Sequence, residues 1–239
     1  MCMCMKVSAD YPKYQEFLDA NLKGEGTYLT FAKKIDKDKI KNIFEIGSRD
    51  AKDAIELSKF YQSHVFAFEC NPVAIEICKS NIGLNPNVTL IPLGVWHESG
   101  EVPFYRVIDG NIGASSFFEF NPEARNYPDI VEEGLIQEKN IVKCIRLDEF
   151  LQKNCIENID LLCMDVQGAA FQVFQSLGDH LFKVKYIIVE LETHPIYSGE
   201  MLYQDVDDYL ISSGFIRGSA PLSPDGLFGD VLYINSTLK

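Results

Sequence analysis

The chain has few basic residues for its length and no long hydrophobic run. Among 239 residues, lysine and arginine number 22 against 35 acidic residues, so the formal net charge is −13. A protein of this sign repels phosphate backbones and anionic lipid. The short basic run between Lys33 and Lys41 alternates with Asp36 and Asp38 and is typical of a solvated helix end. These counts predict a protein that does not act on nucleic acid.

The sequence also lacks the signals of membrane insertion and of disulfide bonding. Its longest strand-like apolar run, Tyr186 to Val189, is far shorter than the roughly 20 residues of a spanning helix. No basic segment leads into an apolar stretch near residue 1. Seven cysteines are an odd number, and Cys2 and Cys4 have no second Cys or His pair nearby. We therefore expect a soluble, cytoplasmic protein with free thiols.

What the sequence does contain is an alternation of apolar strands and amphipathic helices from about residue 42. Helices of about ten residues between strands predict right-handed crossovers, and so an α/β fold with a doubly wound, mostly parallel sheet. The expected strands cover 43–47, 64–69, 88–91, 94–96, 141–145, 159–165, 186–190, 215–217 and 230–234, the last two as a hairpin. Helices are expected over 50–60 and 72–81, from Leu147 and Ala169, and over 205–212.

Two segments depart from this alternation. Residues 8–36 have the spacing of two helical segments broken at 24–26, so residues 1–40 are predicted to be a helical extension of a domain over 41–239. Residues 108–140 are rich in turn residues and aromatic side chains. A loop of that length inside a compact domain is usually functional, and we predict a lid over an acceptor site.

Polar residues follow the first two strands at their carboxyl ends, where ligands bind in such sheets. The run Glu45-Ile46-Gly47-Ser48-Arg49-Asp50 places a glycine at the strand-to-helix turn, which lets the backbone approach a ligand closely. It matches neither the Gly-x-Gly-x-x-Gly fingerprint nor a P-loop. Glu69 ends the second strand 24 residues after Glu45, close to the spacing of about 20 at which an acid meets a ribose diol.

Two later strands end in a similar way. Asp165 follows an apolar strand and precedes Gly168, and Glu190, Glu192 and His194 follow the next such strand. If these strands are neighbours, the four titratable groups share one pocket, where mutual repulsion shifts pKa values towards neutrality.

Several of these runs together resemble the FkbM-type methyltransferases over roughly residues 40 to 235. The resemblance lies in the runs Phe44-Glu45-Ile46-Gly47, Ala67-Phe68-Glu69-Cys70-Asn71-Pro72, Ile159 to Ala169 and Glu190 to Tyr197, together with Asn81. It implies a Rossmann-like seven-stranded sheet with helices on both faces, of the class I methyltransferase type. It also implies S-adenosylmethionine as cofactor and O-methylation of a hydroxyl, such as that of a sugar.

The resemblance assigns roles to individual positions. It implies that Glu69 binds the ribose and that Asp165 lies near the methyl donor, while Ser115 and Ser116 resemble a feature of the family's central loop. We expect Ser115, Ser116 and Glu190 to bind the acceptor. The expected cofactor-binding residues are Glu45, Gly47, Ser48, Arg49, Asp50, Glu69, Cys70, Asn71, Gly94, Val95 and Asp165.

An enzyme of this kind needs a base for the acceptor hydroxyl, and the candidates are Asp165, Glu192 and His194. Gln167 and Ala170 stand where the family often has glutamate, which keeps open a non-catalytic module that binds S-adenosylmethionine or a nucleotide. A nicotinamide-dependent oxidoreductase is disfavoured because the glycine fingerprint is missing. A divalent metal on these carboxylates is possible but is not predicted. The expected partner is a small-molecule or glycan hydroxyl acceptor, and the sequence leaves the oligomeric state open.

Overall fold

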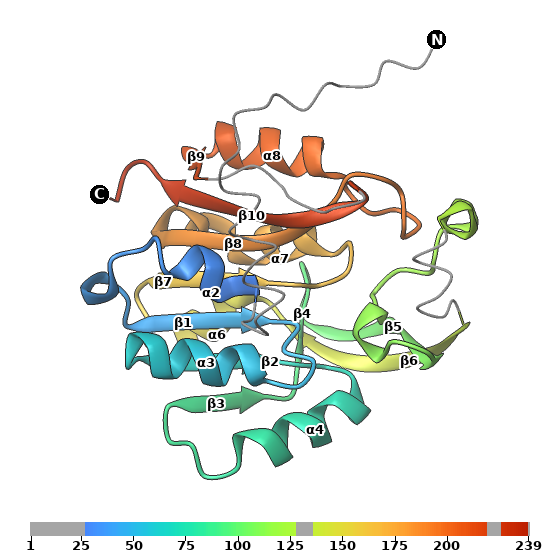
Figure 1. The fold of residues 1–239 in the computed structure, drawn as a ribbon, viewed down its shortest axis with the longest axis horizontal. Coiled ribbons are helices and arrows are strands. Elements are labelled where there is room, and N and C mark those ends of the chain that lie inside the picture. The colour runs from blue at the N-terminus through green and yellow to red at the C-terminus, as the bar shows by residue number, and fades with distance from the viewer. Residues whose placement is uncertain (1–26, 128–135, 219–225, 239) are drawn as a thin grey trace.

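A seven-stranded sheet runs through the middle of the computed structural model, which describes residues 27–127, 136–218 and 226–238 (Figure 1). Its strand order is β3-β2-β1-β7-β8-β10-β9, with β10 antiparallel to both of its neighbours. The strands are β1 Asn42–Ile46, β2 His64–Phe68, β3 Val88–Ile91, β7 Ile159–Met164, β8 Val184–Glu192, β9 Phe215–Arg217 and β10 Phe228–Asn235. The predicted α/β, mostly parallel sheet is therefore confirmed, as is the antiparallel pairing of its last two strands.

Helices cover both faces of this sheet because its strands are apolar on both sides. β7 is buried along its whole length, so neither of its faces tolerates water. α2 Thr27–Ala32, α3 Lys52–Tyr61 and α4 Pro72–Ile82 pack on one face. α6 Leu147–Lys153, α7 Ala170–Leu177 and α8 Tyr203–Ser212 pack on the other. Short 3-10 turns cover Lys37–Lys39, Ile112–Ala114, Pro122–Asn126 and Gly178–Lys183. None of the described helices has the length and hydrophobicity needed to cross a membrane.

The parallel register brings the carboxyl ends of the central strands to one level. Ile46 pairs with Phe68 on one side and with Met164 on the other, so β1, β2 and β7 end side by side. Met164 also pairs with Val189 of β8. Each residue that follows one of these strands therefore faces the same edge of the sheet, which is where the predicted site residues lie.

A second, three-stranded sheet lies beside that edge (Figure 1). Its order is β4-β6-β5, with β4 at Gly94–Val95, β5 at Gly100–Asp109 and β6 at Ile136–Ile145. β5 was not predicted, and β6 begins five residues before the expected strand. Both strands are largely exposed and polar, so they carry no strong apolar alternation. The predicted loop over 108–140 is thus shorter than expected, and residues 128–135 of it lie outside the described residues.

The predicted amino-terminal extension is described only from Thr27. α2 packs against α3 on the sheet, with Tyr28 and Phe31 buried. The expected helical segment before Gly24 lies outside the described residues, so the prediction for it stands as a prediction.

Candidate functional site

The turn after β1 lies directly on the turn after β7. The amides of Gly47 and Ser48 both donate to the carbonyl of Phe68 at 3.0 Å, and the amide of Asp165 donates to the carbonyl of Ile46 at 3.1 Å. Gly47 has a φ of +84°, and a Cβ on it would lie 1.9 Å from the carbonyl oxygen of Asp165. Glycine is therefore required here for both its conformation and its size.

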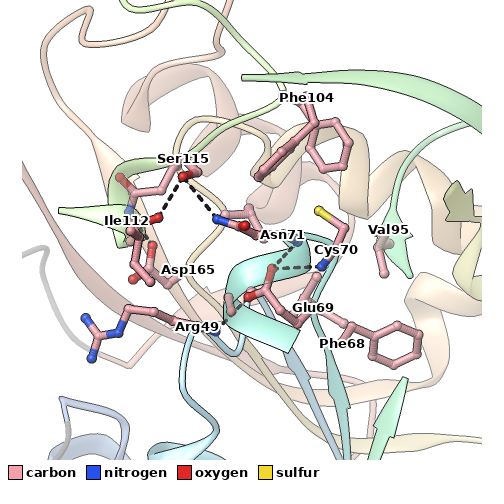
Figure 2. A pocket seen from close by; sticks show the side chains of 18 of the residues that line it. Arg49, Phe68, Glu69, Cys70, Asn71, Val95, Phe104, Ile112, Ser115 and Asp165 are labelled. Carbon is pink, nitrogen blue, oxygen red and sulfur yellow. Dashed lines mark hydrogen bonds between the residues drawn. The ribbon is translucent and has the colours of Figure 1, made fainter. Parts of the chain in front are cut away.

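Glu69 is buried at the end of β2 and is held by three backbone amides (Figure 2). Its Oε1 accepts from the amides of Cys70 and Asn71 at 2.7 Å each, and its Oε2 accepts from the amide of Arg49 at 2.8 Å. Burial raises the pKa of this carboxyl, while the three amides oppose that shift. The three bonds fix the plane of the carboxylate and leave further lone pairs for a ligand with two hydroxyls.

A cavity opens beside Glu69, and we call it the Glu69 cavity. Its far wall is apolar, formed by Phe68, Val95, Phe104 and Phe117. A Cβ on Gly94 would lie 2.7 Å from the Phe117 ring, so this glycine keeps the cavity open. Eight of the expected cofactor-binding residues line it: Gly47, Arg49, Glu69, Cys70, Asn71, Gly94, Val95 and Asp165. Ser115, which was expected to bind the acceptor, lines it too.

Ser115 and Ser116 both lie at the site, but in different ways. The Ser115 hydroxyl accepts from the amide of Val107 at 3.0 Å and contacts the side-chain amide of Asn71 at 3.4 Å (Figure 2). Ser116 is buried and donates to the carbonyl oxygen of Gln167 at 2.6 Å. Ser116 therefore ties the segment after β5 to the turn after β7 and does not line either cavity.

A second cavity, of about 160 Å³, lies next to the first and is here called the Glu192 cavity. Three carboxylic side chains line it, namely Asp165, Glu190 and Glu192, as the adjacency of β7 and β8 predicts. Glu192 is 2% exposed, and its Oε2 has no hydrogen-bond partner. Asp165 lines both cavities, so it stands where they meet.

Burial raises the pKa of each carboxyl in the Glu192 cavity. The pKa of Asp165 is raised, and those of Glu190 and Glu192 lie well above the usual range. Repulsion from Asp165 adds to the shift of Glu190, and repulsion from Glu200 adds to that of Glu192. Carboxyls with raised pKa values are typical of sites that transfer protons.

Three aromatic side chains line the Glu192 cavity: Phe120 lies in the segment predicted as an acceptor lid, whereas sequence reasoning missed Tyr197 and Phe228. Tyr197 is buried, stacks on Phe120 with ring centroids 5.3 Å apart, and donates from its hydroxyl to the side-chain oxygen of Gln167 at 2.6 Å. The only available signal was the position of Tyr197 in the family-like run after β8. Phe228 approaches from the start of β10, remote in the chain, which no local pattern could reveal.

Besides Ser116, four predicted residues do not line either cavity. Glu45 points to the face covered by α3, where burial raises its pKa to about 8. Ser48 is buried in the turn, and Asp50 forms an ion pair with Lys52 at 2.9 Å. His194 is exposed and bonds to the hydroxyl of Thr193 at 2.9 Å. Their predicted roles stay predictions, without support from contact with a cavity.

The carboxylic side chains at this edge are not arranged as a metal centre. Within residues 27–127, 136–218 and 226–238, no three His, Cys, Asp or Glu side chains are placed to hold a metal ion together.

The chain was compared with known families and proteins. The model of the family described as the methyltransferase FkbM domain matches residues 45–217. A relative, the 2-O-methyltransferase NoeI of Sinorhizobium fredii (strain NBRC 101917 / NGR234), is 26% identical over 204 residues. The aligned region covers 82% of this chain and 80% of that relative.

Solved structures with a similar arrangement were also found. Magnesium protoporphyrin IX methyltransferase from Synechocystis PCC 6803, with bound SAM, has a TM-score of 0.49 at 9% identity, covering 94% of this chain and 80% of that one. TrmK of M. capricolum, in complex with S-adenosyl-homocysteine, has a TM-score of 0.46 at 14% identity. That match covers 82% of this chain but 62% of the TrmK chain, so this chain spans less than two thirds of TrmK.

Proposed function

Because the chain belongs to the FkbM methyltransferase family and is a methyltransferase, we propose that it transfers the methyl group of S-adenosylmethionine to a hydroxyl of a sugar or glycan. One observation carries the proposal: Asp165 lines both the apolar Glu69 cavity and the acidic Glu192 cavity. A donor in the first and an acceptor in the second would meet at this carboxyl. The similarity to a 2-O-methyltransferase supports oxygen as the methyl acceptor.

The residues of the Glu69 cavity fit S-adenosylmethionine. Glu69 offers two amide-anchored carboxylate oxygens to the ribose diol, and Phe68, Val95 and Phe117 offer an apolar slot for the adenine. Gly94 has no side chain to fill that slot. When bound, the sulfonium supplies an already activated methyl group, so the chain has only to bind, orient and accept a proton.

In this proposal Asp165 is the general base. It lies where the acceptor oxygen must approach, and a base in that position contributes typically 10²–10⁴-fold to the rate. Burial raises its pKa towards the range in which a base works best at neutral pH. Glu190 and Glu192 would bind other hydroxyls of the acceptor and hold its oxygen in line with the methyl carbon, which is the larger source of rate.

A polyhydroxylated acceptor fits the lining of the Glu192 cavity. Carboxylates accept hydrogen bonds from hydroxyls, and the rings of Phe120, Tyr197 and Phe228 offer flat faces to the apolar side of a sugar. Arg49 is the one basic side chain in the lining, against three acidic ones, so a phosphate or carboxylate on the acceptor would find few favourable partners. The lining therefore favours an uncharged part of a glycan at the point of transfer.

The first experiment is calorimetric titration of the full chain with S-adenosylmethionine and S-adenosylhomocysteine, with NAD as the control ligand. We expect micromolar binding of both adenosyl ligands and none of NAD. Methyl transfer is then measured with labelled donor against a panel of mono- and oligosaccharides. Binding without transfer to any acceptor would favour the non-catalytic module instead, and absence of binding would contradict the proposal altogether.

A further inference from the structure

Gln167 lies beside the carboxyl groups that line the Glu192 cavity and contacts two of them, as well as Tyr197. Its Nε2 donates to Oδ1 of Asp165 and, at 3.0 Å, to Oε1 of Glu190. Its Oε1 accepts from the hydroxyl of Tyr197 at 2.6 Å. The side chain lines both cavities, as Asp165 does. The sequence presented Gln167 as a departure from its family, whereas the structure makes it the link between β7, β8 and the segment after β8.

The backbone around Gln167 holds this side chain in place. Its φ is +50°, a left-handed conformation that non-glycine residues seldom adopt and that recurs at functional sites. Its carbonyl oxygen accepts from the buried hydroxyl of Ser116 at 2.6 Å. A Cβ on the next residue, Gly168, would lie 2.8 Å from a carboxylate oxygen of Glu200 and 3.1 Å from the Tyr197 ring. The turn after β7 is therefore packed between Ser116 on one side and Glu200 and Tyr197 on the other.

Only a primary amide satisfies this set of partners. It has two N–H donors and one carbonyl acceptor, so it can donate to two carboxylates while accepting from a hydroxyl. Glutamate has no donor when ionised and would add a third acidic group beside Asp165 and Glu190. Methionine has a similar length and no donor. Asp165 and Glu190 also share a side-chain hydrogen bond with each other.

We propose that Gln167 is a positioning residue, which orients the carboxyls of Asp165 and Glu190 through its two amide hydrogens so that a carboxylate oxygen of Asp165 faces the acceptor hydroxyl. This inference rests on the proposed function for the identity of the acceptor. Gln167 itself takes no proton. It favours the ionised form of the base and fixes its direction, while Tyr197 prevents the amide from rotating.

The test compares Gln167→Met and Gln167→Glu with the wild type, and Gln175→Met and Gln175→Glu serve as matched controls on the exposed side of α7. Removing the two donors raises the pKa of Asp165, because the Gln167 hydrogen bond lowers it. The rise of kcat with pH should therefore move to higher pH in Gln167→Met, and further in Gln167→Glu. We expect kcat to fall at least roughly tenfold, with a smaller change in the affinity for S-adenosylmethionine.

Other charged groups also face this pair and remain in every variant. They come from six places in the fold: α2, the turn before α3, α3, the end of β2, β8 with the segment that follows it, and β10. The groups are Tyr28, Arg49, Asp53, Glu69, Glu192, Tyr197 and Asp230. The Gln175 variants leave all of them untouched, so a pH profile that moves equally in both sets of variants would overturn the inference.

A measurement that does not depend on turnover tests this inference independently of the proposed function. Carboxyl ¹³C resonances of labelled aspartate and glutamate are titrated in the wild type and in Gln167→Met, each with S-adenosylhomocysteine bound. Higher pKa values of Asp165 and Glu190 in Gln167→Met would support the inference even if no acceptor is methylated. A lack of methylation would count against the proposed function alone. Unmoved titrations, or a lower melting temperature with an unchanged pH profile, would mean that Gln167 is merely structural and overturn the inference.

Discussion

Gly47 and Asp165 lie in direct backbone contact, so closely that a methyl group on the first would overlap the carbonyl oxygen of the second at 1.9 Å. The contact joins the turn after β1 to the turn after β7 and sets the distance between the two cavities. It lies beneath the carboxyl that both cavities share. In the proposed function, the spacing of the donor from the acceptor therefore depends on Gly47, which has no side chain.

Replacing Gly47 by alanine should damage both stability and cofactor binding. The change forces a non-glycine residue to φ +84° and creates a clash with backbone that cannot rotate away. We expect the free energy of unfolding in urea to fall by about 3 kcal/mol or more, a loss typical of substitutions that cause backbone strain and overpacking. Gly214→Ala is the matched control, because its φ is +92° but nothing lies within 4 Å of its Cβ. That variant should lose only about 1–2 kcal/mol. Equal losses would show that the contact with Asp165 is irrelevant.

Replacing Glu69 by alanine should abolish most of the affinity for the cofactor. The carboxylate is the proposed partner of the ribose diol, and hydrogen bonds to charged groups contribute about 1.5–3 kcal/mol each. Calorimetry should show the affinity for S-adenosylmethionine lowered roughly 10- to 100-fold or more. Glu76→Ala removes the same charge from the exposed face of α4 and should bind like the wild type. A Glu69→Ala protein that is folded by circular dichroism and binds normally would refute the assignment.

Two candidate general bases, Asp165 and His194, differ in whether they line a cavity. Asp165 lines both cavities, whereas His194 is exposed and lines neither. Asp165→Asn should therefore lower kcat by roughly 10²-fold or more, while His194→Ala should keep kcat within about twofold of the wild type. Steady-state rates at saturating donor and acceptor decide between them. A large loss in His194→Ala with normal turnover in Asp165→Asn would reverse the assignment.

Stability should depend on pH through Glu45. Burial raises the pKa of its carboxyl from 4.5 to about 8, so the folded protein keeps a proton that the unfolded chain releases between these values. The free energy of unfolding then falls as pH rises through this window, by at most about 1.4 kcal/mol per pH unit for this one group. Glu45→Gln should make the decline shallower between pH 5 and 8.

Urea denaturation at several pH values measures that effect. Glu101→Gln, an exposed acid on β5, serves as the control and should leave the pH dependence as it is. If the curves of Glu45→Gln and the wild type run parallel across the window, Glu45 does not hold a proton in the folded state.

Local patterns were enough to predict the elements of the main sheet. β2, β3 and β9 lie within a residue of their expected bounds because each is a short apolar run between turn residues. β5 was not predicted from the sequence, because its pairing with β6 depends on backbone hydrogen bonds between strands with many exposed positions. A strand of this kind has no apolar alternation to mark it, since neither of its faces is fully covered.

The sequence by itself determined the class of the fold, the family, and the strand ends at which Glu69, Asp165, Glu190 and Glu192 stand. These are local properties: a hydrophobic period, a glycine at a turn, an acid at the end of an apolar run. Only the tertiary structure decided which of those residues face a cavity. It turned Glu45 towards α3, left His194 exposed, and placed Gln167 between two carboxylates. Such relationships depend on strand order and on side-chain direction across segments far apart in the chain, which no short stretch of sequence specifies.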